Sequence, residues 1–472
     1  MLKNFLKTST ILSLAICAIL LLVACNNNDT SSNGSANNNN NSSNNDDTAS
    51  ATRTPVSITW RTVGEDCMMR AHLERFVPLF ETDNPDIEIV LEPIAASEGD
   101  YFARIALALQ SPDTAPNVVS QDTFQINADA SAGFLLALDE YLDDWEEMEH
   151  FVPALLQGVT AADGNIYAIP ATTDTRGLWH DREVLNQAGI ATPWEPASWE
   201  DVLNAAEAVR DNVPDAVPLA FNVATANGEA TTMQTFLMLL HGTGEVLFDF
   251  DESAWVIESQ GFYDSLEFIY EVFNVRNLGP SMGIAMNSNY GSVIYQEMFP
   301  AGLVGIGLDG FWQANNWRED GVAPIENVEE RIGFAAMPTQ FGQGLGSVTL
   351  AGGWGWSIPA HSTEHEASLR VIKALSTYEH NVHRVNHGGN ITVRSDVAQN
   401  PEYQARAFIR EATDWLDMAI FRPAMDEYPT ISVEIQTIVE AVASGAATPE
   451  QAMANFGDAV IRIVGEDNVI RR

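Results

Sequence analysis

Basic residues are scarce in this sequence, and lysine is nearly absent. Lys3, Lys7 and Lys373 are the only lysines among 472 residues. Because 65 acidic residues face 23 basic ones, the formal net charge at pH 7 is −42. A field of this sign repels phosphate groups, so we expect no nucleic-acid partner.

Long apolar runs are also missing, with one exception near the amino terminus. Lys3 and Lys7 precede an apolar run from Ile11 to Ala24, which has the charged start, apolar middle and small-residue end that are typical of a secretory signal. The run is short for a membrane-spanning helix, although a plain signal peptide or a membrane anchor is the alternative. The tetrapeptide Leu22-Val23-Ala24-Cys25 resembles the lipobox of bacterial lipoproteins. This resemblance implies a signal peptide over 1–25 and a lipid on Cys25, which would fix the chain to the outer face of the cytoplasmic membrane, at the cell surface or in the periplasm.

Cysteine is too rare for a disulfide framework. Cys17 lies in the predicted signal peptide and Cys25 carries the predicted lipid, so Cys67 is the only free thiol that we expect in the mature chain. Cys67 has no evident base beside it, and no Gly-x-Ser-x-Gly motif is present. We therefore expect no nucleophilic catalysis and predict that the protein is not an enzyme.

Residues 26–55 contain hardly any apolar side chain and are dominated by asparagine, serine and threonine. Such a segment cannot bury enough surface to offset its chain entropy. As a flexible coil of about 30 residues it would reach roughly 30 Å. We predict a disordered tether between the lipid and the folded part of the chain.

The rest of the chain, from residue 56 to residue 472, is too long for one ordinary core and suits two lobes. Its first part alternates strand and helix patterns, with strands predicted at Val56–Trp60, Asp86–Glu92 and Asn117–Ser120. This order indicates an α/β fold with a parallel sheet, in which ligand sites lie outside the carboxyl ends of the strands. Trp60-Arg61 and Gln121-Asp122 occupy two such ends.

Helix capping signals appear at two places further on. Ser198 has Asp201 three residues later, in the spacing of a capping box. Thr448-Pro449-Glu450-Gln451 combines an N-cap, a proline at the first helical position and an answering glutamine. These signals predict helices that begin after Ser198 and after Thr448, the second running towards Val464.

Several stretches, taken in order, resemble the extracellular solute-binding proteins of bacterial ATP-binding-cassette (ABC) importers, in particular the sugar-binding group that includes maltose-binding protein. No single stretch is specific, but their order and spacing are. They extend over nearly all of the chain after the tether: ITWRTVG (58–64), NPDIEIV (84–90), DGNIYAIP (163–170), GLWHDREVLNQAGI (177–190), PASWEDVLNAA (196–206), GLVGIGLDGFW (302–312), AGGWGWSIPAHSTEHEA (351–367) and GGNITVRSD (388–396).

The resemblance implies a two-lobed periplasmic-binding-protein-like fold, in which each lobe is a mainly parallel sheet flanked by helices. We expect one lobe to contain residues 56–168 plus 308–350, and the other to contain residues 169–307 plus 351–472. Hinge crossings would then fall near Ile169–Ala171, Leu308–Gly310 and Ala351–Gly353. Many relatives have Tyr-Asn-Lys where this chain has Trp179-His180-Asp181, so one lysine contact is missing here.

A sugar presents flat C–H faces and hydroxyls that both donate and accept hydrogen bonds. Its binding site therefore needs aromatic rings together with carboxylate, amide and guanidinium groups. The candidate platforms are Trp60, Trp179, Trp312 and Trp354, all of which the resemblance places at lobe edges or crossings. The candidate polar contacts are Arg61, Gln121, Asp122, Asp309 and Arg394.

Several of these residues also have structural interpretations. Trp179 could pack its helix, Asp122 could cap the next helix, and Arg394 could hold an ion pair. Trp354 and Trp356, in the glycine-rich stretch Leu350–Pro359, lie two residues apart, so a regular strand would point both to one face. We expect Trp354 to contact the ligand and Trp356 to pack in the core.

His380, His383 and His387 are spaced at i, i+3 and i+7, close to one helix face. Imidazoles at this spacing can share a zinc ion. Surface histidines in a helix more often meet solvent, and the glycines at 388 and 389 end the helix at the last one. We therefore predict no metal site and no cofactor.

Together these features predict a lipid-anchored, monomeric binding protein that closes two lobes over a carbohydrate and delivers it to the permease subunits of an ABC importer. Three alternatives stay open at this stage. The solute could be an anion, an iron complex or a peptide; the protein could be the binding subunit of a sensor or an adhesin; and a glycoside hydrolase would also need tryptophans and a carboxylate pair.

Overall fold

The computed structural model of the protein describes residues 53–62, 68–96 and 98–472. The predicted signal peptide, Cys25 and nearly all of the predicted tether lie outside these described residues, as does Cys67. None of the described helices has both the length and the apolar character that crossing a membrane requires.

The first sheet has the strand order β2-β1-β3-β13-β4. Strand β1 runs parallel to β2 and β3, whereas β13 runs antiparallel to β3 and β4. The strand predicted at Asp86–Glu92 is confirmed as β2, in which Ile87 and Ile89 are buried while Glu88 and Glu92 are exposed. The strands are β1 (Thr54–Thr62), β2 (Ile87–Ala95), β3 (Val118–Asp122), β4 (Ile169–Thr173) and β13 (Gly353–Ser357).

The second sheet has the order β10-β5-β9-β6. Strand β5 runs antiparallel to β9 and β10, and β6 runs parallel to β9. Its strands are β5 (Arg176–Asp181), β6 (Val217–Ala220), β9 (Val304–Gly310) and β10 (Ile332–Ala335). Two small sheets accompany it: β11 (Met337–Pro338), β12 (Ser347–Leu350) and β14 (Ala419–Ile420) form one, and β7 (Phe248–Asp249), β8 (Ala254–Glu258) and β15 (Val469–Arg471) form the other.

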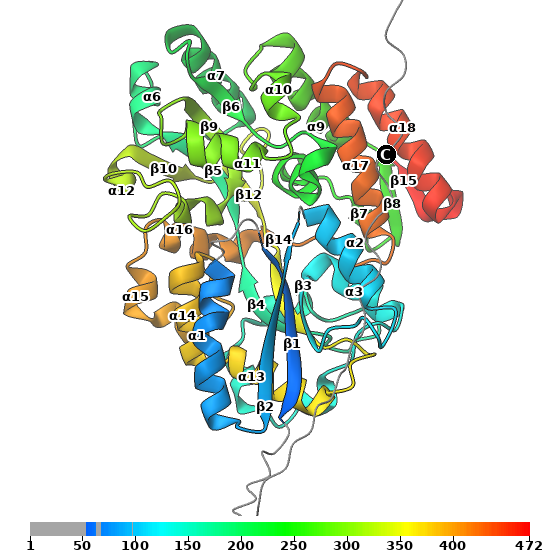
Figure 1. Cartoon of the computed structure of the whole chain (residues 1–472). Coiled ribbons are helices and arrows are strands. Elements are labelled where there is room, and N and C mark those ends of the chain that lie inside the picture. The colour runs from blue at the N-terminus through cyan, green and yellow to red at the C-terminus, as the bar shows by residue number, and fades with distance from the viewer. Residues whose placement is uncertain (1–52, 63–67, 97) are drawn as a thin grey trace, which may run out of the picture. The chain divides into compact units, whose positions relative to one another are not determined.

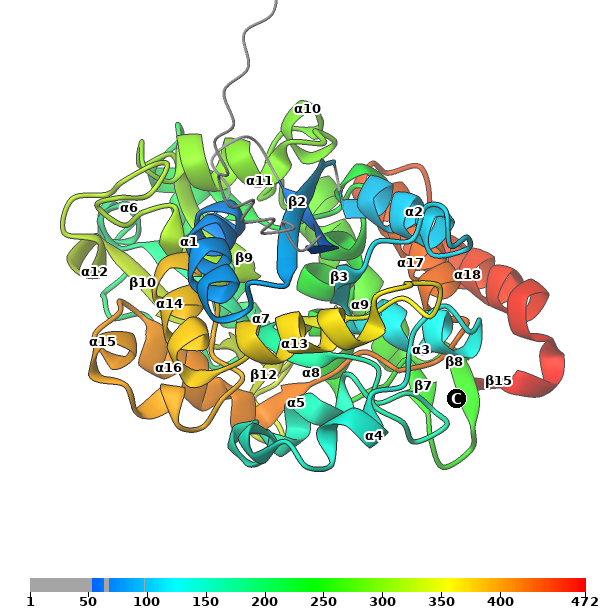
Figure 2. The ribbon, with the colours of Figure 1, turned by 60° about the horizontal axis from the view of Figure 1, so that its bottom comes forward.

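Helices pack on the first sheet and bury an apolar core between them. Val56, Ile58 and Trp60 of β1 pack with Phe76 of α1 and Ile372 of α13 in one cluster, and Figures 1 and 2 show α1 and α13 beside β1 and β2. The helices in this part of the chain are α1 (Met68–Asp83), α2 (Glu98–Ala108), α3 (Thr123–Ser131), α4 (Asp139–Leu142), α5 (Pro153–Gln157), α13 (His365–Leu375) and α14 (Tyr378–Gly388).

A larger apolar cluster surrounds the second sheet, and the helices α7, α9, α17 and α18 contribute to it. The remaining helices are α6 (Arg182–Gln187), α7 (Trp199–Asn212), α8 (Met238–Thr243), α9 (Gln260–Tyr270), α10 (Met282–Ala285), α11 (Tyr290–Ser292), α12 (Val328–Arg331), α15 (Pro401–Gln404), α16 (Ile409–Asp414), α17 (Tyr428–Ala443) and α18 (Pro449–Val464). A π-helical segment, η3 (Thr231–Leu237), continues directly into α8.

Both predicted helix starts are confirmed. The Ser198 hydroxyl accepts a hydrogen bond from the backbone N–H of Asp201 and caps α7. The Thr448 side chain accepts from the backbone N–H of Gln451, and the Gln451 side chain accepts in return from the Thr448 backbone. Helix α18 then runs from Pro449 to Val464, as predicted.

The α/β class is confirmed, but both main sheets are mixed and not mainly parallel. Strand pairing does not follow the predicted division of the chain throughout. Strand β10, expected with residues 56–168, pairs with β5, whereas β4 and β13, both expected with residues 169–307, lie in the first sheet, where β13 pairs with β3 and β4. The division was implied by the family resemblance, which does not specify the sheet in which each strand pairs. The lobe boundaries themselves stay a prediction.

The chain passes between the two main sheets near the predicted hinges but not at all of them. Asp174 and Thr175 connect β4 to β5, and Ala351 and Gly352 connect β13 to β12 of the small sheet, whose Val348 and Leu350 belong to the apolar cluster around the second sheet. Leu308–Gly310, also predicted as a hinge, instead forms the end of β9, and the next strand of the main sheets, β10, lies in the same sheet.

Histidines join α1 to α14. His72 of α1 is buried, and its Nδ1 lies 3.1 Å from Nδ1 of His383. The two rings stack with centroids 5.4 Å apart, and His383 stacks in turn on His387 at 4.2 Å. The ring of His380 packs edge-on against Phe76, with centroids 4.9 Å apart. The histidines thus meet a neighbouring helix and each other, and within the described part of the chain no group of three or more His, Cys, Asp or Glu side chains is arranged to hold a metal ion.

This packing disfavours protonation of the imidazoles. Burial, together with the nearby Arg384 guanidinium and the imidazoles of His383 and His380, lowers the pKa of His72 from 6.5 to about 2, and Arg75 on α1 acts in the same direction. Burial lowers the pKa of His383 to about 4. As the pH falls, the imidazoles are protonated at a higher pH in the unfolded chain than in the folded protein. The free energy of unfolding therefore decreases as the pH falls below about 6.5.

We predict that replacing His72 by glutamine makes folding less sensitive to acid. At pH 4.5 the wild-type protein should have lost roughly 2–3 kcal/mol through His72 alone, because the unfolded state is protonated at this residue and the folded state is not. Urea unfolding at pH 8 and pH 4.5 measures this difference. His72→Gln should lose less stability between the two pH values than the wild type, whereas His361→Gln, outside the α1–α14 contact, should behave like the wild type. Equal losses for both variants would contradict this explanation.

Candidate ligand-binding site

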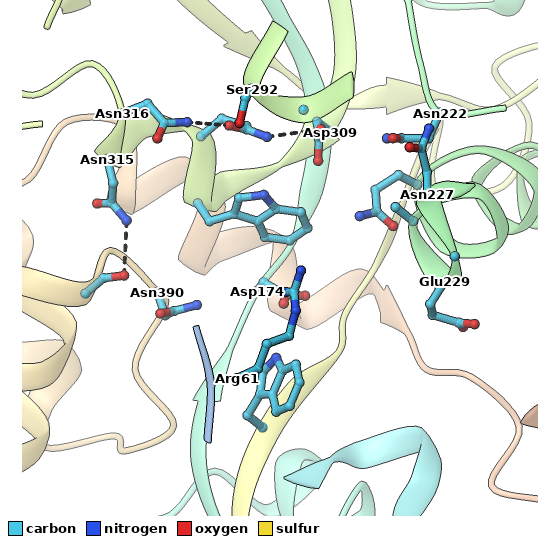
Figure 3. A pocket seen from close by; sticks show the side chains of 18 of the residues that line it. Arg61, Asp174, Asn222, Asn227, Glu229, Ser292, Asp309, Asn315, Asn316 and Asn390 are labelled. Atoms are coloured by element: carbon cyan, nitrogen blue, oxygen red, sulfur yellow. Dashed lines mark hydrogen bonds between the residues drawn. The ribbon is translucent and has the colours of Figure 1, made fainter. Parts of the chain in front are cut away.

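A cavity of about 1020 Å³ lies where strands of both main sheets end. Arg61 near the end of β1 and Asp122 at the end of β3 line it from the first sheet, and Asp309 near the end of β9 lines it from the second. These are carboxyl ends of strands, where the ligands of α/β sheets bind. Figure 3 shows Arg61 and Asp309 reaching the cavity from opposite sides.

Five of the nine predicted ligand residues line this cavity: Arg61, Asp122, Asp309, Trp312 and Trp354. The structure places the other four elsewhere. Trp60 and Gln121 are the chain neighbours of Arg61 and Asp122, and consecutive residues of a strand point to opposite faces. Trp60 therefore lies in the apolar core of the first sheet, and the Gln121 amide donates a hydrogen bond to buried Asp129.

Trp179 and Arg394 have structural roles. An ion pair was the alternative for Arg394, whereas Trp179 packs from strand β5 and not from a helix. Trp179 is fully buried, stacks on Phe334 at 3.9 Å between ring centroids and donates from Nε1 to the carbonyl oxygen of Gly310. Arg394 is fully buried and forms ion pairs with Glu147 at 2.6 Å and Asp396 at 2.7 Å.

Two partly exposed indoles remain at the cavity. Trp354 is held by Tyr101 and Phe102, with ring centroids 5.9 and 6.1 Å away. The strand is irregular between Trp354 and Gly355, so Trp354 and Trp356 do not share a face as they would in a regular strand. Trp356 is 1% exposed and packs in the core of the first sheet.

Glycine places both indoles, in different ways. A Cβ atom at Gly310 would lie 1.9 Å from the ring of Trp312, so only glycine lets this indole fold back over the end of β9. A Cβ atom at Gly353, where φ is +154°, would lie 2.3 Å from the carbonyl oxygen of Thr172. The glycine before Trp354 is therefore required by the neighbouring strand β4.

Amide side chains surround the rings, and sequence reasoning missed them. Figure 3 shows Asn222 and Asn227 on one side of the cavity and Asn315, Asn316 and Asn390 on the other. Asn315 donates to the carbonyl oxygen of Gly388 at 3.1 Å, which ties the two segments together. Asn222 follows the carboxyl end of β6 and could have been found by the same strand-end argument. The others lie in turns and short helices without a periodic signal.

Asp309 is a buried acid on the side of the second sheet, and its side chain forms no ion pair with any described residue. Its Oδ1 accepts from the backbone N–H of Gly310 at 2.7 Å, and its Oδ2 accepts from the Gln313 amide at 3.1 Å. Burial raises the pKa of Asp309 to about 6. Because neutral pH lies above this pKa, Asp309 is mainly a carboxylate there and can accept hydrogen bonds.

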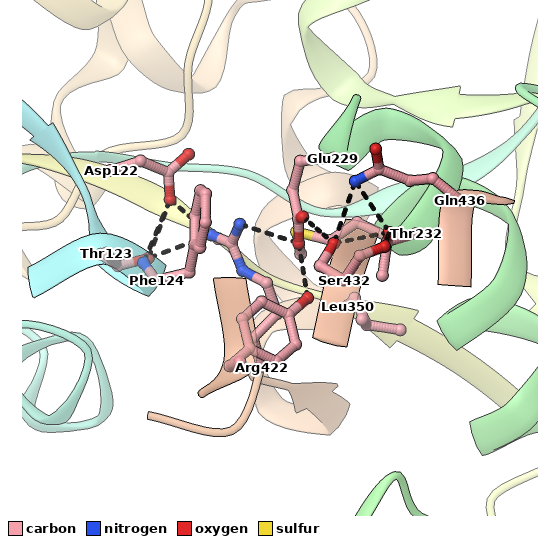
Figure 4. A network of polar contacts seen from close by, with 12 residues as sticks. Asp122, Thr123, Phe124, Glu229, Thr232, Leu350, Arg422, Ser432 and Gln436 are labelled. Atoms are coloured by element: carbon pink, nitrogen blue, oxygen red, sulfur yellow. Dashed lines mark hydrogen bonds and ion pairs between the residues drawn. The ribbon is translucent and has the colours of Figure 1, made fainter. Parts of the chain in front are cut away.

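Arg422 joins two carboxylates at the cavity. Its Nη2 lies 2.6 Å from Oδ1 of Asp122, and its Nη1 lies 3.4 Å from Oε1 of Glu229 (Figure 4). Glu229 also accepts hydrogen bonds from Tyr428 and Ser432 of α17. Asp122 belongs to the first sheet, whereas Glu229 precedes η3, which packs with the second. The Asp122–Arg422–Glu229 bridge therefore connects the two sides of the cavity.

Both carboxylates of this bridge are removed from water. Burial raises the pKa of Asp122 and of Glu229, and the positive charge of Arg422 opposes that rise. Asp122 also accepts from the backbone N–H of Phe124 and so caps α3, which was the structural alternative for this residue. The guanidinium of Arg422 lies 4.6 Å from the ring centroid of Phe124, within the range of a cation–π contact.

We predict that Arg422→Met destabilises the protein by roughly 3–5 kcal/mol, because it leaves two buried carboxylates without a cation. The folded-state pKa of both carboxyls should then rise further, and a carboxyl with a raised pKa loses stability as the pH increases. The deficit should accordingly be larger at pH 8 than at pH 5. Urea unfolding at both pH values measures it, with Arg410→Met on the exposed face of α16 as the control. A deficit that does not depend on pH would contradict the account.

Solved structures with the same fold contain bound sugars. The maltose-bound MalE3 of T. maritima superposes with a TM-score of 0.74, at 22% identity, over 87% of this chain and 100% of that chain. The GacH receptor of Streptomyces glaucescens, solved unliganded and with acarbose, has a TM-score of 0.72 at 20% identity, over 88% and 99% of the two chains. These similarities establish the two-lobed fold that the sequence resemblance implied.

Sequence comparison leads to the same family. A putative binding protein of Brucella abortus is 20% identical over 398 residues, which cover 83% of this chain and 90% of that protein. The sequence pattern of bacterial extracellular solute-binding proteins matches residues 69–381, which is well over half of the chain. The chain therefore belongs to the family of bacterial extracellular solute-binding proteins.

Proposed function

We propose that the protein captures a carbohydrate in the cavity between its two sheets and delivers it to the permease of an ABC importer. The observation that carries this proposal is the lining of the cavity. Two partly exposed indoles, Trp312 and Trp354, lie among amides, guanidinium groups and carboxylates. This is the combination that a solute with flat C–H faces and many hydroxyls requires.

Size and similarity support the same ligand class. About 1020 Å³ is at the upper end of the usual range for small-molecule sites, roughly 300–1,000 Å³. Two proteins of the same fold hold maltose and acarbose. Because residues from both sheets line the cavity, a ligand would gain its full set of contacts only when both sides close on it, and ligand binding would favour the closed form.

We propose binding without chemical conversion of the ligand. A glycoside hydrolase needs one carboxylic acid and one carboxylate on either side of the scissile bond. Among the described carboxylates that are buried at this cavity, Asp122 and Glu229 are engaged by Arg422 and Asp174 is engaged by Arg176, which leaves Asp309 without an ion-pair partner. That engagement supports a role for these carboxylates in holding the site together.

We further propose that a lipid on Cys25 and the polar segment of residues 26–55 tether the protein, as a monomer, to the outer face of the cytoplasmic membrane. The apolar run before Cys25 and the composition of the segment after it support this arrangement. A tether with a reach of roughly 30 Å would let the folded part meet a permease in the same membrane.

A thermal-shift screen of the purified protein against sugars, amino acids, polyamines and metal ions tests the ligand class. A sugar present at about 100 times its dissociation constant should add roughly 2.7 kcal/mol to the free energy of unfolding. Calorimetric titration of that sugar should then show at least a tenfold weaker affinity, about 1.4 kcal/mol, for Trp312→Ala and for Trp354→Ala.

Trp145→Ala is the matched control. Trp145 is a partly buried indole that packs against the apolar core of the first sheet and does not line the cavity. Its affinity for the sugar should equal that of the wild type. A screen in which amino acids, polyamines or metal ions stabilise the protein and no sugar does would refute the proposed ligand class.

A further inference from the structure

Arg176 occupies an unusual position, because it belongs both to a connection between the sheets and to the cavity wall. It is the first residue of β5, directly after Asp174 and Thr175, which lead out of β4. Its side chain is 5% exposed, and both Arg176 and Asp174 line the cavity. The proposed function assigns no role to this guanidinium.

Hydrogen bonds fasten Arg176 to the other connection between the sheets. Its Nη1 donates to Asp174 Oδ1 and, at 3.0 Å, to the carbonyl oxygen of Leu350. The same Asp174 oxygen accepts from the backbone N–H of Gly352 at 3.0 Å. Thr349 Oγ1 accepts from the backbone N–H of Arg176 at 2.8 Å. Arg176 and Asp174 thus join the β4–β5 connection to the β12–β13 connection.

The same guanidinium faces the indole of Trp312. The Cζ of Arg176 lies 5.2 Å from the centroid of that ring, within cation–π range. Gly310 leaves the space in which the ring folds back. Nη2 of Arg176 also lies 3.6 Å from the sulfur of Met233, which lines the cavity as well. The Trp312 ring therefore contacts a group that the connections hold.

We propose that Arg176 is a positioning residue of the ligand site, whose guanidinium sets the placement of the Trp312 ring relative to the connections between the sheets. The part of this proposal that concerns ligand affinity depends on the proposed carbohydrate function. The ring placement does not, since it concerns the protein without ligand. A movement of the two connections would carry the ring with it, so closure of the cavity and stacking on Trp312 would be coupled.

Arg394 provides a matched comparison for a purely structural role. It too is a buried arginine with acidic partners, and its Cζ lies 5.4 Å from the centroid of an aromatic ring, that of Phe151. Arg394 does not line the cavity. A general loss of stability should therefore follow from replacing either arginine, whereas an effect on Trp312 should follow from replacing Arg176 alone.

The test is ¹⁹F NMR of the full chain labelled with 5-fluorotryptophan, which should give one resonance for each of its 11 tryptophans. The resonance that disappears in Trp312→Phe identifies the ring. Without ligand, we expect this resonance to shift and broaden in Arg176→Met and to keep its wild-type position in Arg394→Met. Arg176→Lys retains the positive charge but lacks the planar guanidinium. In this variant the Trp312 resonance should lie between its wild-type position and its position in Arg176→Met.

The second readout is the affinity for the sugar that gives the largest thermal shift. We expect about a tenfold loss in Arg176→Met, a smaller loss in Arg176→Lys and no loss in Arg394→Met. If Arg176→Met does not fold, Asp174→Asn serves in its place, because it removes one anchor of the guanidinium and should move the same resonance.

An unchanged Trp312 resonance in Arg176→Met, or equal changes in the Arg176 and Arg394 variants, would overturn the proposal. A moved resonance with unchanged sugar affinity would overturn it as well, because Arg176 would then position a ring that the ligand does not use. If the wild-type protein binds no sugar at all, the proposed function fails, and the ligand-free spectra still decide whether Arg176 places the ring.

Discussion

Arg422 lies between Asp122 and Glu229 and neutralises much of the charge of two carboxylates that reach the cavity from its two sides. Removing three charged groups from water is costly, and it is tolerated only when the groups bond to one another and to further donors. Tyr428 and Ser432 provide donors for Glu229, and the start of α3 provides one for Asp122. The relative placement of β3, η3 and α17 depends on this bridge, and so does the shape of the cavity between them.

The rest of the site follows from strand ends and from two connections between sheets. Strands β1, β3 and β9 each place one side chain in the cavity and its chain neighbour outside it, because successive residues of a strand point to opposite faces. Asp174 and Gly352 bond directly across the two connections, at 3.0 Å. Residues of both sheets thereby line one cavity, and buried charged side chains form part of its wall. The aromatic rings and amides of its lining are left for the solute.

Sequence reasoning succeeded where a local physical signal exists. The start of α18 at Pro449 follows from a capping box, and the placement of Arg61 and Asp122 at the cavity follows from the position of polar residues at strand ends. Asp309 was a candidate because the family resemblance implied a crossing between the lobes there. Sequence reasoning failed where the information is tertiary. Trp60 and Trp179 resemble platforms in sequence, but their strands turn them into the cores. The partners of Arg422 are about 300 and 193 residues away in the chain, and no local pattern predicts such a bridge or the pairing of β13 with β3.

In the proposed complex, one solute contacts groups from both sheets at the same time. Hydrogen exchange of backbone amides can be measured with and without the sugar that gives the largest thermal shift. We expect this sugar to slow exchange both at the β3–α3 junction around Asp122 and at the β9–η6 junction around Trp312, where η6 spans Phe311–Asn315. Protection confined to the segments of one sheet would mean that the solute does not bridge the two sheets.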